Sequence, residues 1–204
     1  ITNNNAETRD YMFQLLGTMF MTNPESKAAY GAKMMNLYGA SGSNGKSLSL
    51  GLIADTLNGL RVKNFPTQNN TAGISIMNLK DKNYTSVFVN KIFVYDPDVT
   101  KSYLPETISD ILKKYTAGDE TTVEAKYENA IVVRPSLLMA IGSNERIKSS
   151  DKTGGLERRM SWFDIDKKFP YNINENPEHQ EFFNKLFTED ASNYIFELIL
   201  KGYI

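Results

Sequence analysis

Short runs of consecutive apolar residues alternate along the chain with stretches in which apolar residues recur every three or four positions. The first pattern is typical of strands buried on both faces, and the second of helices with one apolar face. Strands are predicted at residues 34–38, 87–95, 137–141 and 160–165, with a shorter one at 74–77. Helices are predicted at residues 6–20, 25–34, 47–57, 104–115, 177–187 and 190–201. The alternation over residues 120–133 predicts a β-hairpin.

Buried strands that alternate with helices predict an α/β fold. We expect a three-layer sandwich with a mainly parallel sheet and flanking helices at both ends. The core is expected over residues 36–170. The N-terminal segment 1–35 and the C-terminal segment 171–204 are expected to form a separate helical collar or lid.

The composition excludes several kinds of chemistry. The 23 basic and 24 acidic side chains give a net charge of −1, so there is no overall basic field for coating duplex DNA, although a narrow channel needs only a few cations. With no cysteine and only His179 as histidine, disulfides, thiol catalysis and cysteine or multi-histidine metal sites are excluded. No apolar run reaches the roughly 20 residues of a membrane span, and the first residues lack the blocks of a signal peptide. A cytoplasmic protein is expected, and the absence of an initiator methionine suggests a fragment of a longer one.

Residues 40–47, Ala-Ser-Gly-Ser-Asn-Gly-Lys-Ser, have the spacing of a Walker A phosphate-binding loop, with alanine where glycine is commoner. A buried strand precedes the loop and a helix follows it, a context that a plain glycine-serine turn would lack. Lys46 is expected to meet the β- and γ-phosphates of ATP, and the Ser47 hydroxyl to hold Mg²⁺. The predicted nucleotide-binding residues are Gly42, Ser43, Asn44, Gly45, Lys46, Ser47 and Leu48.

A P-loop ATPase also needs carboxylates beside the magnesium, at the end of a neighbouring strand. The second predicted strand runs into Asp96-Pro97-Asp98. We expect Asp96 to contact the magnesium and Asp98 to orient the attacking water, both as catalytic residues. The alternative is that Asp-Pro-Asp is only a turn that ends the strand.

Two further polar signals complete the candidate catalytic set. Asn144 follows the strand at 137–141, where an amide can bond the γ-phosphate or the attacking water; alone, it would be an ordinary turn asparagine. Arg158 and Arg159 precede the last predicted strand. In a ring ATPase, an arginine at this place reaches the γ-phosphate of the neighbouring subunit; the alternative is a solvated surface pair.

Together these residues resemble the superfamily 3 helicases of viruses, phages and mobile elements, members of the AAA+ class, and the poxvirus and phage primase-helicase branch in particular. The resemblance spans about residues 10–170. The Asn-Gly-Lys-Ser loop and the Gly-Asp segment are its more specific parts. Five features carry it in the order of the family, namely Leu15-Leu-Gly17, Leu37 through Ser47, Lys113 through Asp119, the strand ending at Asn144, and Arg158-Arg159.

The resemblance implies a P-loop AAA+ ATPase that uses ATP and Mg²⁺ to unwind or translocate along DNA from 3′ to 5′. It also implies self-association of the full-length protein into a ring, usually a hexamer, and a viral or mobile-element origin in a bacterial host cell. The family carries a β-hairpin whose basic tip tracks single-stranded DNA. Here the hairpin would be residues 120–134, with Lys126 and Tyr127 as the DNA-binding residues. The alternative for Lys126 is a plain exposed lysine.

The sequence departs from the family pattern at three places. The phosphate loop has one extra residue between Gly39 and Lys46, and Asp96-Pro97-Asp98 replaces a glutamate-containing acidic pair. Ala117 stands where the family often has glycine. Which residue activates water is therefore open, and hydrolysis slower than the family's is compatible with retained nucleotide binding.

Three functions remain open from the sequence. The leading one is a replicative DNA helicase motor. The second is a P-loop enzyme that acts on a small molecule, such as a kinase, although no acceptor-binding signature accompanies the loop. The third is an ATP-binding assembly or loading factor that binds DNA without unwinding it. Oligomerisation with ATP separates the first from the second, and strand displacement separates the first from the third.

Overall fold

The computed structural model describes residues 5–59, 69–124, 129–169 and 177–203. Its α-helices are α1 (Ala6–Gly17), α2 (Pro24–Tyr30), α3 (Lys46–Gly59), α4 (Glu106–Ala117), α5 (Pro177–Leu186) and α6 (Glu189–Tyr203). Short 3₁₀ helices are η1 (Thr18–Phe20), η2 (Ile76–Lys80), η3 (Lys82–Phe88) and η4 (Glu157–Arg159). None of the helices in these ranges is long and apolar enough to cross a membrane.

The central sheet is parallel and has the strand order β2-β3-β7-β1-β9. Its strands are β1 (Met34–Tyr38), β2 (Thr71–Gly73), β3 (Phe93–Val99), β7 (Leu138–Ser143) and β9 (Met160–Asp164). Outside it, β4 (Tyr103–Leu104) pairs with β8 (Lys148–Ser149), and β5 (Thr121–Val123) pairs with β6 (Ile131–Val133). Because the central strands run in one direction, the loops that follow them gather at a single edge of the sheet.

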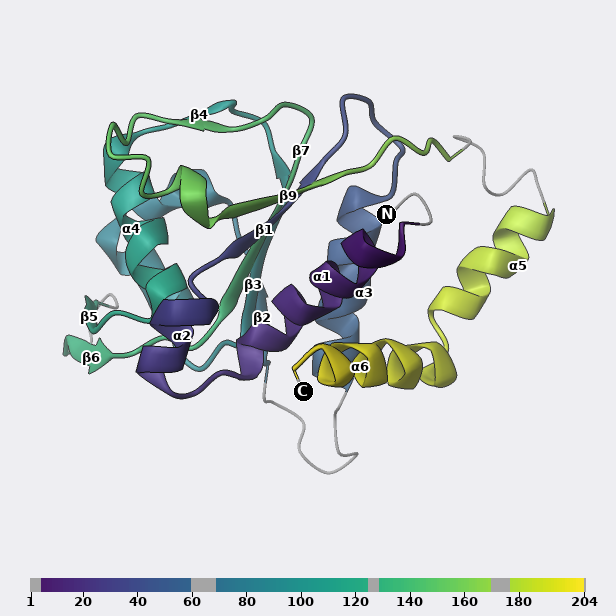
Figure 1. Ribbon diagram of the computed structural model, residues 1–204, viewed down its shortest axis with the longest axis horizontal. Coiled ribbons are helices and arrows are strands. Elements are labelled where there is room, and N and C mark those ends of the chain that lie inside the picture. Colours follow the sequence, from purple (N-terminus) through teal and green to yellow (C-terminus); the bar gives the residue numbers. More distant parts are fainter. Residues whose placement is uncertain (1–4, 60–68, 125–128, 170–176, 204) are drawn as a thin grey trace.

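Helices cover both faces of the sheet, as Figure 1 shows. On one face, α1, α3 and α6 bury apolar side chains such as Leu16, Leu50 and Ile199 in a cluster shared with the strands. On the other face, η2 and α4 contribute Leu79 and Leu112 to a second cluster. The predicted three-layer α/β sandwich with a parallel sheet is confirmed.

The helices near the two ends of the chain pack against each other, so segments far apart in sequence lie side by side (Figure 1). The ring of Phe20, after α1, meets the rings of Phe196 and Tyr203 of α6 edge-on. Both helices also join the apolar cluster around α3. The division into collar segments 1–35 and 171–204 and a core stays a prediction.

The second predicted strand begins later than expected. A strand was predicted at 87–95, but β3 begins at Phe93 and residues 82–88 form η3. Asn90 has a left-handed conformation with φ of 57°, which interrupts an extended run. Phe88 is buried all the same. A short apolar run therefore cannot separate a buried 3₁₀ turn from a strand.

The same strand also ends later than expected. Asp96, Pro97 and Asp98 lie inside β3, which continues to Val99. Its pairing with β7 shifts register between Asp96 and Val99, so the strand bends within the acidic stretch. Asp-Pro-Asp is thus an irregular part of the strand, and no turn ends the strand before it.

Two shorter elements also differ from expectation. The helix predicted at 25–34 ends at Tyr30, because Gly31 closes it and Met34 already belongs to β1. The short strand predicted at 74–77 does not form there, because β2 covers Thr71–Gly73 and Ile76 begins η2. The helix was therefore predicted with a wrong boundary, and the strand was predicted on the wrong residues.

Candidate functional site

The phosphate loop connects β1 to α3 at the edge where the strands end. Ser43 and Gly45 have positive φ values of 59° and 84°, conformations that let successive backbone N–H groups turn toward a bound anion. At Gly39, a Cβ would collide with the Asn44 side chain and would lie 2.8 Å from the carbonyl oxygen of Ile165, so only glycine fits. Asn44 is buried, and its amide donates a 2.8 Å hydrogen bond within the loop. The predicted loop therefore has the backbone form of an anion cradle.

Lys46 is buried at the centre of this loop, with 5% of its surface exposed. Burial lowers the pKa of Lys46, and the negative charge of Asp98 opposes that shift. Four oxygens lie within hydrogen-bond distance of its three N–H donors, those of Gly39 (carbonyl, 3.1 Å), Ser41 (carbonyl, 3.4 Å), Asn44 (amide, 2.9 Å) and Asn144 (amide, 2.8 Å). None of these oxygens is charged. A buried ammonium with neutral partners fits a phosphate, which would supply the missing negative charge.

Asn144 reaches Lys46 because β1 and β7 are parallel neighbours. Tyr38, the last residue of β1, pairs with Ser143, the last residue of β7, so the next residue of each strand enters the same loop cluster. Gly142 makes the approach possible, since a Cβ there would lie 2.6 Å from the carbonyl oxygen of Pro97 and 3.5 Å from the Lys46 side chain. Gly142 was not among the predicted residues. The sequence feature that could have identified it was a glycine near the end of an otherwise apolar strand.

The two predicted aspartates have different surroundings. Asp98 is exposed, and it is the carboxylate whose charge reaches Lys46. Asp96 is 5% exposed, and its two oxygens accept backbone hydrogen bonds from Ile76 (2.8 Å) and Asp98 (3.2 Å). Burial raises the pKa of the Asp96 carboxyl, the two N–H groups oppose that rise, and the charge of Asp98 adds to it. Asp98 is therefore the more accessible anion.

A magnesium ion would meet oxygen donors from two elements at this edge. The Ser47 hydroxyl donates to the carbonyl oxygen of Pro97 at 3.0 Å, so the first turn of α3 touches the acidic part of β3. Ser47, Asp96 and Asp98 are the residues that could hold the ion. Across the described ranges, no cluster of three or more His, Cys, Asp or Glu side chains could hold a metal by itself. Magnesium usually combines one or two carboxylates with phosphate oxygens of its substrate, and this donor set fits that arrangement.

Arg158 and Arg159 lie at the opposite edge of the sheet from the phosphate loop. They end η4, and the next residue, Met160, pairs with Met34 at the start of β1. Arg158 is exposed, whereas Arg159 is half-buried and donates to the carbonyl oxygen of Gly155 at 2.7 Å. Burial lowers the pKa of Arg159, and the charge of Arg158 adds to that shift. Neither arginine is near the phosphate loop of its own chain.

A buried aspartate holds the turn that precedes these arginines. The Asp151 carboxylate accepts hydrogen bonds from Thr153 and from the backbone N–H of Leu156, and it lies 3.3 Å from the Lys113 ammonium. The Thr153 hydroxyl is the main cause that lowers the pKa of Asp151. Asp151 was not predicted, although Lys113 belongs to the segment that carried the resemblance. The signal was an aspartate ahead of Thr-Gly-Gly, a composition typical of side-chain-capped turns.

The predicted hairpin is present as the antiparallel pair β5 and β6. Lys126 and Tyr127 lie outside the described residues, so their DNA-binding role stays a prediction. At the base of the hairpin, Arg134 pairs with Glu120 at 3.1 Å.

The range matched by one family model covers this whole arrangement. The model, described as a family of unknown function, DUF5906, matches residues 37–159, which is more than half of the chain. The chain belongs to the DUF5906 family. The matched range includes Lys46, Asp96, Asn144 and the arginine pair. No curated protein matches the sequence.

Solved structures share the fold of this DUF5906 member. The apo structure of the NrS-1 C-terminal region matches with a TM-score of 0.59 at 14% identity, over 91% of this chain and 41% of that one. Its A form matches with a TM-score of 0.55 at 13% identity, over 99% and 39%. This chain therefore spans about two fifths of the NrS-1 region, and the α/β fold is common to both. A JCV helicase bound to a small-molecule acetamide gives a TM-score of 0.47 at 14% identity over 98% and 61%, too low to establish a shared fold.

Beyond the range matched by the DUF5906 model, residues 165–169 run along the phosphate loop. The backbone N–H of Phe169 donates to the carbonyl oxygen of Ser43 at 2.7 Å. Its ring faces Gly45, where a Cβ would lie 3.1 Å away, and meets the Phe183 ring of α5 edge-on at 6.2 Å. Phe169 was not predicted, and it links the phosphate loop to the C-terminal helices.

A second unpredicted residue at this edge is Arg146, two residues after Asn144. Its guanidinium donates to both carboxylate oxygens of Asp164 at 2.9 Å and lies 5.3 Å from the ring centroids of Tyr38 and Trp162. Arg146 therefore ties the ends of β1 and β9 together beside the phosphate loop. An exposed arginine in a loop carries no signal in a single sequence.

Proposed function

We propose that this chain is the ATP-hydrolysing motor domain of a superfamily 3 DNA helicase or translocase that acts in DNA replication. The observation that carries the proposal is the 2.8 Å contact between Lys46 Nζ and Asn144 Oδ1. A phosphate-loop lysine and a strand-end asparagine meet there at the carboxyl edge of a parallel sheet, the edge at which α/β proteins bind nucleotides. The exposed Asp98 and the Ser47 hydroxyl border the same point.

Lys46 would exchange its neutral oxygen partners for the β- and γ-phosphate oxygens of ATP. The exchange favours binding, because a buried ammonium gains charged partners in place of amide and carbonyl oxygens. The backbone N–H groups from Gly42 through Leu48 would donate to the remaining phosphate oxygens. The positive end of α3 points the same way, as at other helix N-termini that bind phosphate.

Ser47 and Asp96 would hold the magnesium ion. When bound, the ion would supply positive charge that offsets the negative charge developing on the phosphate oxygens. We assign Asp98 to the attacking water, because it is the exposed carboxylate whose charge reaches Lys46. Asn144 would hold either that water or the γ-phosphate through its amide.

Arg158 and Arg159 would act on the ATP of a neighbouring subunit. Their position at the far edge from their own phosphate loop supports action between subunits. An arginine of this kind stabilises the charge of the transition state. The full-length protein would accordingly form a ring, as a hexamer, around single-stranded DNA contacted by Lys126 and Tyr127, in the cytoplasm of a bacterial host.

One observation favours a second function. Both oxygens of Asp96 already accept backbone hydrogen bonds, and burial raises the pKa of the carboxyl. Such a group is a weaker ligand for a cation than an exposed carboxylate. A chain that binds ATP but hydrolyses it slowly would suit an assembly or loading factor that binds DNA without unwinding it.

Strand displacement separates these two functions. The chain would be incubated with ATP, Mg²⁺ and a labelled DNA duplex that carries a single-stranded 3′ tail, beside the same duplex with a 5′ tail. The motor predicts ATP-dependent release of the labelled strand from the 3′-tailed duplex only. Hydrolysis of ATP without release from either duplex would favour the loading factor.

A further inference from the structure

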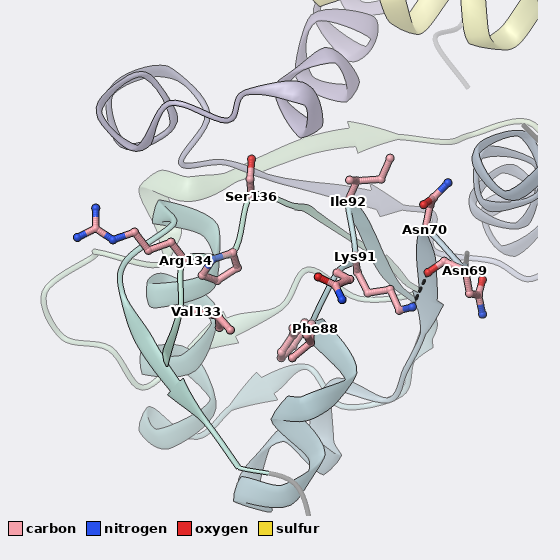
Figure 2. A pocket seen from close by; sticks show the side chains of 11 residues that line it. Asn69, Asn70, Phe88, Lys91, Ile92, Val133, Arg134 and Ser136 are labelled. Carbon is pink, nitrogen blue, oxygen red and sulfur yellow. Dashed lines mark hydrogen bonds between the residues drawn. The ribbon is translucent and has the colours of Figure 1, made fainter. Parts of the chain in front are cut away.

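A cavity of about 720 Å³ lies at the edge of the sheet where the strands begin, away from the phosphate loop. Its walls are three segments that directly precede strands of the sheet, so the sheet itself fixes their spacing. The segments are Asn69 and Asn70 before β2, 88–92 before β3, and 133–136 before β7. Figure 2 shows them surrounding one hollow.

The lining of this cavity carries positive charge only. Lys91 and Arg134 are its charged members, three more of the eleven lining residues are asparagines, and none is acidic. The whole chain has one more acidic than basic side chain, so the positive charge of the cavity lining does not follow from the overall composition. A concave surface of this kind concentrates anions.

Lys91 is the cation that faces the hollow. It is half-buried, and its Nζ donates to the backbone carbonyl oxygen of Asn69, the dashed line in Figure 2. An ammonium group has three N–H donors, so two remain for a ligand. Lys91 takes part in none of the ion pairs found among the described residues.

Arg134 is the cation at the rim. Figure 2 shows its side chain directed away from Lys91. It pairs there with Glu120 at 3.1 Å, and both side chains are 59% exposed. Exposed ion pairs add little stability, so an anion at the rim can replace Glu120 as the partner of the guanidinium with a small loss of free energy.

The cavity continues the base of the hairpin. Val133 is the last residue of β6, and the chain from there to Ser136 forms one wall before β7 begins. Asn90, exposed and in the left-handed conformation, belongs to the opposite wall. A polyanionic strand that follows the hairpin would reach the cavity at its foot.

We propose that this cavity binds one nucleotide of a nucleic-acid single strand. Lys91 contacts a phosphate, Arg134 contacts the adjacent phosphate at the rim, and the asparagine amides bond the edge of a base. The volume suits this occupant, since pockets for single small ligands are roughly 300–1,000 Å³. The choice of a strand as ligand rests on the proposed function, whereas the cavity and its charge do not.

The test is the binding of a fluorescently labelled oligothymidylate to the chain in the absence of ATP, followed by anisotropy. Lys91→Ala should weaken binding roughly tenfold, because a charge-assisted hydrogen bond is lost. The slope of log affinity against log salt should fall by about 0.7, the value for one phosphate contact on a single strand. Lys148→Ala removes an exposed charge from β8, at the other edge of the sheet, and should change affinity less than about twofold.

The ion pair at the rim offers a matched pair of variants. Arg134→Gln and Glu120→Gln break the same contact, but only the second leaves the guanidinium free for a phosphate. We expect Arg134→Gln to bind the oligothymidylate more weakly than the unaltered chain, and Glu120→Gln to bind it more tightly. Weaker binding in both variants would mean that the pair only supports the hairpin, and would overturn the role of Arg134.

Equal affinities of Lys91→Ala and the unaltered chain, with both folded, would overturn the proposal. Displacement of the labelled strand by free thymidine monophosphate at the same nucleotide concentration would overturn the strand as the occupant. ATP hydrolysis, measured in parallel, shows whether the cavity proposal or the proposed ATPase function has failed. If Lys91→Ala loses strand binding, the cavity is supported as the binding site, even when the chain hydrolyses no ATP. If the chain hydrolyses ATP and Lys91→Ala binds the strand unchanged, the proposed motor function stands and the proposed role of the cavity is wrong.

Discussion

At the scale of single residues, the central feature is a buried cation without a bonded anion. Lys46 is almost fully enclosed, and its partners are carbonyl and amide oxygens. Removing an ammonium from water costs free energy, and hydrogen bonds to neutral oxygens offset only part of that cost. Groups perturbed in this way cluster at sites where a ligand completes the charge balance. This physical reason for phosphate binding is independent of the loop's sequence pattern.

Phe169→Ala should weaken nucleotide binding more than it lowers turnover at saturating ATP. The ring packs on Gly45, so its removal loosens the backbone of the phosphate loop and leaves Lys46 in place. We expect a loss of about 1–2 kcal/mol, or roughly tenfold in affinity, measured with a fluorescent ATP analogue. Phe182→Ala is the control, since the Phe182 ring meets that of Phe183 edge-on and is half exposed, whereas the Phe169 ring packs on Gly45. Equal effects of the two variants would contradict a role for Phe169 at the loop.

The meeting of Lys46 and Asn144 could be predicted, whereas Phe169 and Arg146, which also follow strands of the sheet, could not be recognised as neighbours of the loop. Lys46 and Asn144 were found because parallel strands bring the loops that follow them to one edge of a sheet. Phe169 and Arg146 approach the same edge on segments whose placement depends on contacts with α5 and β9. Those contacts have no local pattern. Asp96 and Asp98 were both predicted as site residues, but the sequence could not show that Asp96 is buried and Asp98 is exposed.

At the scale of elements, α2 is held in place by one buried lysine. Lys27 is 1% exposed, and its Nζ donates to the carbonyl oxygen of Thr18 in η1 at 3.1 Å. Its aliphatic stem lies beside Gly31 and beside Gly118 at the end of α4. Burial lowers the pKa of Lys27 to about 8. The lysine therefore joins three elements while carrying a charge that the interior disfavours.

Lys27→Met should stabilise the fold near neutral pH. Methionine fills a similar volume without a buried charge, which favours the folded state by about 2 kcal/mol. Because the folded pKa of about 8 lies below the ordinary 10.5, the unfolded chain binds more protons between these values. The unaltered chain therefore gains stability as pH rises through that window, and the advantage of the variant should shrink.

Urea unfolding of both chains at about pH 7 and about pH 9.5 measures this difference. Lys201→Met, on the exposed side of α6, is the control and should show no such dependence. An advantage of Lys27→Met that stays constant or grows with pH would contradict a buried charge at Lys27.

The elements themselves were predicted where periodicity was strong. The helices from α3 to α6 and the strands β1, β7 and β9 occur within a few residues of their expected places. The stretch before β3 was misread, because Val87 and Phe88 are apolar on a 3₁₀ turn that local pattern cannot distinguish from a strand. The turn at Asn90 was the available cue, since asparagine tolerates positive φ better than most residues.

At the scale of the whole molecule, the candidate groups lie at two opposite edges of one sheet. The phosphate loop, Asp98 and Asn144 lie where the strands end, while Arg158 and Arg159 lie where they begin. A single chain therefore does not combine all of the predicted catalytic groups. Under the proposed function, a neighbouring copy would therefore have to bring its arginine pair to the phosphate loop of this chain.

Removal of both arginines, in Arg158→Ala/Arg159→Ala, should lower ATP turnover without abolishing nucleotide binding. A loss of about 10³-fold is expected for a group that stabilises transition-state charge. Mixing this variant with Lys46→Ala should restore part of the turnover in the assembled protein, because each chain supplies what the other lacks. Full activity of the arginine variant alone would remove the assignment, and no recovery on mixing would contradict action between subunits.

The central claim is that Lys46 and its neighbours form an ATP-hydrolysing site that serves a DNA motor. The most direct measurement is ATP hydrolysis by the purified chain, with and without single-stranded DNA, beside Lys46→Ala. We expect DNA to stimulate turnover, and Lys46→Ala to lower turnover by about 10²-fold or more. Turnover that is unchanged in Lys46→Ala would contradict the central claim.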